Sequence, residues 1–150
     1  MSKTIIILPI LAIIGLCGFF ENPMAQDKYV AVGYTGQATT CLNAKCFEEK
    51  FAAGEPAQYD LKDENVQIHM EVRGKSKSGN TVVYLRIDDF NESQVPENMR
   101  IIAKNAKGSD MVCALDSSDV DKIMAGNVDK TMLDNCDGPL KGWIMLIPEK

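Results

Sequence analysis

The chain has little of the residue types on which most catalytic and nucleic-acid-binding sites depend. Its 150 residues include one histidine, and 21 aspartates and glutamates outnumber 16 lysines and arginines, for a formal net charge of −5. That charge has the wrong sign for attraction to nucleic acid or anionic lipid. No two cysteines have the C-x-x-C spacing of a zinc site or a thiol oxidoreductase. We therefore expect no metal, no other cofactor and no nucleic-acid partner.

What is present is typical of one small folded domain. Hydrophobic residues make up 45% of the chain and charged residues 25%. These fractions exclude a fully disordered chain and a protein with several membrane spans. The length corresponds to roughly one domain.

The N-terminus has the pattern of an export signal. Lys3 precedes an apolar run over residues 4–20, and a polar break comes after it. The apolar core of a signal peptide has about 7–15 residues and a membrane-spanning helix about 20, so the run fits either. Residues 1–25 are thus predicted to be a signal peptide or an N-terminal membrane anchor. We expect a periplasmic or extracellular protein, held in the inner membrane only if residues 4–20 are not cleaved off.

The cysteines beyond this leader favour the same compartment. Cys41, Cys46, Cys113 and Cys136 are an even set, which in an exported module indicates two disulfides. Three pairings are open, and the pairing of sequence neighbours, 41–46 with 113–136, has the lowest loop-closure cost. Five residues of regular helix separate Cα atoms by roughly 8–9 Å, beyond the disulfide limit of about 7 Å. A bond between the first two cysteines therefore requires a turn or the start of a helix.

The segment 26–63 is predicted to be an N-terminal extension. Residues 29–34 alternate as in a strand, and residues 45–53 are helix formers that end at Gly54. A polar connector over residues 55–63 then leads to a change of pattern, and we place a domain boundary near residue 64.

The rest of the chain, residues 64–150, has mainly β patterns. Residues 66–72 alternate strictly and residues 81–87 are rich in β-branched side chains, which predicts a hairpin. A short amphipathic helix is expected over residues 117–125. Further extended segments are expected over residues 99–103, 111–115, 128–133 and 143–147. One core should include Ile68, Met70, Val83, Leu85, Val112, Ile144 and Leu146, with Tyr84 and Trp143 also packed inside.

This order of elements is that of the OB-fold, a five-stranded Greek-key barrel. The segments QIHMEVRGKSKSGNTVVYLRI, MVCALDSSDVDKIMAG and LDNCDGPLKGWIMLIP resemble the opening hairpin, the strand with its helix and the closing strands of exported OB-fold proteins of the tRNA-anti-like type. The resemblance implies a mainly β barrel with a short helix over residues 64–150. A small disulfide-linked β-sandwich or an α+β domain remains the alternative.

Candidate functional residues are few. Arg73, Lys75, Lys77 and Arg86 bring positive charge to the predicted hairpin and are possible contacts for a partner, although lysines at strand edges also prevent edge pairing. His69 lies on the polar side of its strand, which favours a surface position. No catalytic residues are predicted, because the adjacent carboxylates Asp88 and Asp89 of one strand point to opposite faces.

The sequence therefore indicates an exported, non-enzymatic module that binds a protein or a cell-envelope component. A small subunit of a secretion or transfer apparatus, or an enzyme of an unrecognised type, remains the alternative.

Overall fold

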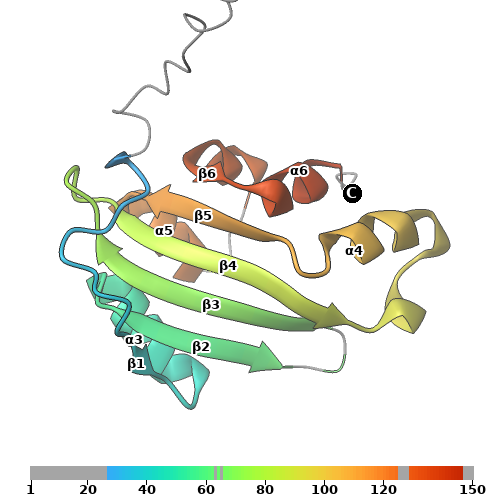
Figure 1. Cartoon of the computed structure of the whole chain (residues 1–150), viewed down its shortest axis with the longest axis horizontal. Coiled ribbons are helices and arrows are strands. Elements are labelled where there is room, and N and C mark those ends of the chain that lie inside the picture. The colour runs from blue at the N-terminus through green and yellow to red at the C-terminus, as the bar shows by residue number, and fades with distance from the viewer. Residues whose placement is uncertain (1–26, 63, 65, 125–128, 147–150) are drawn as a thin grey trace, which may run out of the picture.

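The chain folds around one six-stranded sheet whose strands follow sequence order (Figure 1). The computed structural model describes residues 27–62, 64, 66–124 and 129–146, without the side chains of residues 123 and 124. The first pair of strands is parallel and all other pairs are antiparallel. The strands are β1 (Thr39–Thr40), β2 (Ala57–Lys62), β3 (Val66–Lys75), β4 (Thr81–Phe90), β5 (Asp110–Leu115) and β6 (Cys136–Asp137).

Helices cover one side of this sheet, which we name the covered face. In Figure 1, α3 and α5 lie behind the strands, α6 lies beside β5, and α4 lies at one end. The α-helices are α3 (Ala44–Ala53), α4 (Arg100–Ala106), α5 (Ser117–Met124) and α6 (Pro139–Met145); the short 3-10 helices are η1 (Glu92–Gln94), η2 (Glu97–Met99) and η3 (Lys130–Asn135).

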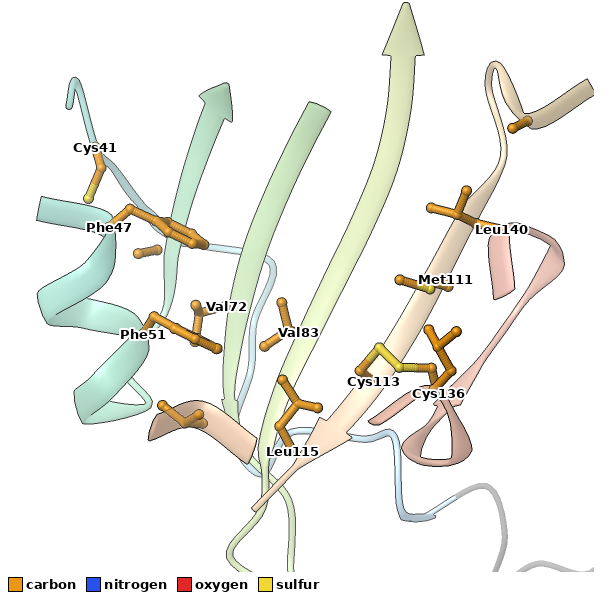
Figure 2. Close-up of a cluster of buried hydrophobic side chains, with 14 residues drawn as sticks. Cys41, Phe47, Phe51, Val72, Val83, Met111, Cys113, Leu115, Cys136 and Leu140 are labelled. Carbon is orange, nitrogen blue, oxygen red and sulfur yellow. A yellow bond between two sulfur atoms is a disulfide. The ribbon is translucent and has the colours of Figure 1, made fainter. Parts of the chain in front are cut away.

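The core lies between the covered face and these helices (Figure 2). Phe47 and Phe51 of α3 stack with ring centroids 6.2 Å apart and pack onto the sheet. The strand register aligns one buried row of side chains across the sheet, namely Ala57, Val72, Val83, Cys113 and Cys136.

Both predicted disulfides are confirmed. Cys41 and Cys46 are bonded with Cα atoms 5.5 Å apart, and Asn43 between them caps the N-terminus of α3. The pair therefore lies at a helix start, as geometry requires. Cys113 and Cys136 are bonded between the neighbouring strands β5 and β6, with Cα atoms 3.9 Å apart. Two disulfides fit a compartment outside the reducing cytosol.

Within the ranges that the structure describes, no helix is both long enough and apolar enough to cross a bilayer. The predicted leader, residues 1–25, lies outside these ranges.

The architecture is α+β and mainly β, but the sheet is not closed into a barrel. Its outer strands β1 and β6 have two residues each, and they pair with β2 and β5, not with each other. The OB-fold barrel and its Greek-key order are therefore not confirmed, and the described strands form one sheet in place of a sandwich of two.

Several predicted elements are also corrected. Residues 99–103 fall at η2 and in helix α4, and residues 143–146 fall in or just after helix α6, which begins at Pro139. Short apolar runs fit helix and strand equally well, and proline favours the first turn of a helix. Residues 130–133 form part of η3, whereas 128 and 147 lie outside the described residues.

The segment before residue 64 differs most from its prediction. Residues 29–34 form no strand and make one isolated bridge, between Ala31 and Ser76. The expected connector instead contains β2, which pairs with β3 along its whole length. Because α3 and β2 also contribute to the core, residues 39–62 share one sheet and one core with the strands from β3 onward.

Other elements are confirmed. Helix α3 and the hairpin of β3 and β4 occur where the pattern places them, and α5 matches the predicted helix up to Met124. Of the expected core, Val83 is buried, Met70, Leu85 and Ile144 pack against it half-buried, and Ile68 is half-buried. Leu146 is 58% exposed, so its core position was a wrong prediction.

Candidate functional site on the open face of the sheet

The side of the sheet opposite the helices lies in front in Figure 1, and we name it the open face. It is polar along most of the strands, but at one end the paired side chains of Val82 and Ala114 are fully buried. It is formed by every second residue of the strands, because side chains alternate between the two faces. Hydrogen bonds, ion pairs and register place on it Asp60 and Lys62 of β2; His69, Glu71 and Arg73 of β3; Tyr84, Arg86 and Asp88 of β4; Asp110 and Val112 of β5; and Asp137 of β6.

Arg73 is held in place from two directions. Its Nε donates to Glu71 Oε2 over 3.1 Å, and its guanidinium carbon lies 4.5 Å from the centre of the Tyr84 ring. Tyr34 belongs to the segment that crosses one end of the sheet, and the centre of its ring lies 5.9 Å from the same guanidinium carbon of Arg73. A stacked and paired guanidinium loses little side-chain freedom when it binds a ligand.

Tyr84 connects this arginine to the next strand. Its hydroxyl donates to Asp110 Oδ2 over 3.0 Å. Burial raises the pKa of Tyr84 above its ordinary value, and the hydrogen bond to Asp110 raises it further, while Arg86 acts in the opposite direction. The phenol therefore stays protonated as a hydrogen-bond donor throughout the physiological pH range. Tyr84 and Val112 lie on the open face, so their predicted core positions were wrong.

Arg86 forms the second oriented cation of the open face. Its Nε donates to Asp88 Oδ1 over 2.6 Å. This bond lowers the pKa of Asp88 and raises that of Arg86. The two side chains are 42% and 38% exposed, so solvent screening limits the pair to about 1 kcal/mol at most.

His69 pairs with a carboxylate of the neighbouring strand. Its Nδ1 lies 2.7 Å from Asp60 Oδ1, and its ring meets Tyr84 edge-on at 6.3 Å. A carboxylate orients a histidine in this way in general-base sites, which also need a nucleophile within reach. Among the hydrogen bonds of the described residues, His69 makes none to a serine, threonine or cysteine. His69 thus lies on the polar face, as predicted, where its side chain is 21% exposed and hydrogen-bonded.

A hollow of about 260 Å³ lies toward the β6 side of the open face. Arg73 and Tyr84 line one side, Asp110 and Val112 of β5 lie between, and Asp137 and Gly138 line the other side. Gly138 has φ +124°, and an added Cβ would lie 2.7 Å from the Asp110 carbonyl oxygen. Only glycine therefore lets β6 approach β5 this closely at the edge of the hollow.

The covered face has a second cavity, of about 290 Å³, between α3 and the sheet. Its lining is almost entirely apolar, and Glu48 is the charged residue at its edge. The side chains of the sheet that face it include Tyr59, Leu61, Met70 and Leu85.

In the described part of the chain, no three histidine, cysteine, aspartate or glutamate side chains gather to hold a metal ion.

The four predicted partner contacts lie in three places. Arg73 and Arg86 share the open face. Lys75 instead runs beside Gly54 at the end of α3, and Lys77 pairs with Asp27 over 2.9 Å. Their role in binding stays a prediction, but the structure does not join them into one basic patch.

Sequence reasoning missed the acidic part of the site. Asp110 and Asp137 line the same hollow as Arg73 only through the register of β4, β5 and β6. Asp110 lies two residues before Val112 in a predicted strand, so alternation could have placed both side chains on the same face of the sheet. Asp137, in a turn-like sequence, offered none.

The chain matches no protein-family model, no curated protein and no solved structure. The resemblance to exported OB-fold proteins consequently stays a prediction.

Proposed function

We propose that this protein is an exported, non-enzymatic module that binds a protein or another cell-envelope component on the open face of its sheet. The observation that carries the proposal is the contrast between the two faces. Helices bury the apolar face, whereas the described segments leave most of the polar face uncovered.

The residue types of the open face support a binding role. Arginine and tyrosine are enriched at the energetic centres of protein interfaces. Arg73, Tyr84 and Arg86 are each held by a neighbour, so little conformational entropy is lost when they engage a partner.

The charge of the open face favours a partner other than nucleic acid. Five carboxylates, those of Asp60, Glu71, Asp88, Asp110 and Asp137, face the three cations of Lys62, Arg73 and Arg86. A phosphate backbone would meet net negative charge here. A surface of mixed sign fits a protein or a peptide with complementary charges.

Site-specific cross-linking tests this proposal. A photo-reactive amino acid replaces Lys62 or Arg86 on the open face in cells that make the protein, and matched control positions are Glu49 on α3 and Asp121 on α5, both exposed. We expect one discrete adduct from the two open-face positions and none from the controls. Equal adducts from all four positions, or none from the open face, would overturn the proposal.

A charge-reversal variant makes the test specific. Arg86→Glu should lower the yield of the adduct formed from position 62 by about tenfold, since reversing a charge at an interface costs more than about 1.4 kcal/mol. Lys122→Glu on α5 is the matched control and should leave the yield unchanged.

A further inference from the structure

The hollow on the open face has charges of opposite sign at its two ends. Arg73 lines one end, and its ion pair with Glu71 uses Nε, which leaves the two terminal nitrogens for a ligand. Asp137 lines the other end, and Asp110, which accepts a hydrogen bond from the Tyr84 hydroxyl, lies on the strand between them. Within the described residues, neither of these carboxylates has a lysine or arginine at ion-pair distance.

Between these ends lies a less polar floor. Tyr84 pairs with Val112, and Val112 with Asp137, so one row crosses β4, β5 and β6. Neighbouring strands lie about 4.8 Å apart, which places Tyr84 and Asp137 about 10 Å apart across the sheet. The guanidinium of Arg73 is stacked over Tyr84, so the positive end lies above one side of this row and the negative end at the other.

A ligand with one sign of charge would match only one end. A simple carboxylate would be repelled by the like charges of Asp110 and Asp137, and a simple amine would be repelled by that of Arg73. A short zwitterion would satisfy both ends if its charges were several ångströms apart. An extended chain of five methylenes separates an ammonium from a carboxylate by roughly 8 Å, given bond lengths of about 1.5 Å.

We propose that the hollow binds a short zwitterion of this length, with its carboxylate on Arg73, its ammonium between Asp110 and Asp137, and its methylenes over Tyr84 and Val112. The chemical class is a diamino acid with a free carboxylate, such as a C-terminal lysine. The inference rests on the proposed function only in taking the open face as a binding surface, and it names the group of the partner that the face would recognise.

Binding of ε-aminocaproate, which has this spacing of charges, tests the inference on the full chain purified with both disulfides formed. We expect saturable shifts of the backbone amide signals of Tyr84, Val112 and Asp137 in NMR titrations. Caproate lacks the ammonium and hexylamine lacks the carboxylate, so each should bind at least about tenfold more weakly, because each loses one charge-assisted contact. Glycine, whose charges are too close together, should also bind weakly.

Charge-neutral variants locate the ligand. Arg73→Gln should weaken binding of ε-aminocaproate by about tenfold or more, and Asp137→Asn should do the same at the other end. Arg100→Gln on α4 and Asp121→Asn on α5 are matched controls outside the hollow and should bind as the parent protein does. Far-UV circular dichroism checks that each variant is folded.

The inference would be overturned by a lack of ε-aminocaproate binding, and also by either of two binding patterns. One is equal binding of caproate, hexylamine and ε-aminocaproate, and the other is an equal loss of binding in the control variants. Neither depends on the cross-linking test. If open-face adducts form but the zwitterion does not bind, this inference fails and the proposed function stands.

Discussion

The two faces of the sheet consist of the same strands but differ in what their side chains contact. On the covered face, Val72 and Val83 are buried against helices and make apolar contacts. On the open face, their neighbours Arg73 and Tyr84 contact each other and carboxylates, and remain partly accessible. A residue shifted by one position along a strand moves from one environment to the other.

We expect the two faces to have different roles, the covered face in stability and the open face in binding. Burial of apolar surface is the main favourable term in folding, so the covered face should hold most of the stability. Exposed ion pairs contribute little to stability, so charge changes on the open face should alter binding while the fold persists. Variants on each face test this division.

The largest effect is expected on the covered face. Phe51 is 5% exposed and stacks on Phe47, so Phe51→Ala should lower the free energy of unfolding by about 3–5 kcal/mol through lost burial and the cavity left behind. Urea denaturation measures this change. Leu42→Ala is the control, because Leu42 is 91% exposed and its loss should change stability by about 0.5 kcal/mol at most. Similar losses in both variants would refute the position of α3 on the sheet.

The disulfides should come next. Replacing Cys113 and Cys136 together by serine should cost roughly 3 kcal/mol, since the bond closes a loop with a sequence separation of 23. The same change at Cys41 and Cys46, with a separation of 5, should cost roughly 2 kcal/mol because a shorter loop restricts the unfolded chain less. Thermal or urea unfolding of the two double variants shows which one loses more stability. A larger loss for the Cys41 and Cys46 variant would contradict the prediction.

On the open face, Tyr84→Phe should cost about 1 kcal/mol at neutral pH, the usual net contribution of one hydrogen bond. Because the pKa of Tyr84 is raised in the folded state, its contribution is fully present below the unfolded-state pKa of about 10 and is lost as pH rises through the folded-state pKa. The difference in stability between parent and variant should therefore shrink at high pH. A constant difference across the alkaline range would show that Tyr84 titrates normally.

The smallest effect is expected for Arg86→Gln. The hydrogen bond from Arg86 lowers the pKa of Asp88, so the stabilisation is present above the ordinary aspartate pKa of about 3.9 and is lost as pH falls through the lowered value. NMR titration of the Asp88 carboxyl should show its pKa rising toward the ordinary value in the variant. Because the pair is exposed, stability at neutral pH should change by about 1 kcal/mol or less.

The sequence predicted best those elements whose evidence is local. The strict alternation of residues 66–72 predicted β3, and the helix formers before Gly54 predicted α3. The cysteine pairing was also accessible, since each bond joins the nearest partner along the chain.

Short segments with few local signals were predicted poorly. The run MRIIA at residues 99–103 fits a strand by composition, but it lies where the chain turns away from the sheet and continues as α4. Residues 57–62 resemble a connector because Gln58, Asp60 and Lys62 are polar. The residues between them, Ala57, Tyr59 and Leu61, form too short an apolar series to indicate a strand with certainty. Pairing with β3 makes this segment a strand, and pairing is a tertiary event.

Local sequence is sufficient to specify the central hairpin and the helix α3, because each depends on residues that are close along the chain. It left three disulfide pairings open and favoured the observed one only by its low loop-closure cost. The open edges of the sheet, and the meeting of Arg73, Tyr84, Asp110 and Asp137 in one hollow, arise only in the folded molecule. These four residues come from four strands, and their meeting depends on register between strands. Register is set by which face becomes buried, and that choice is made when the whole core packs.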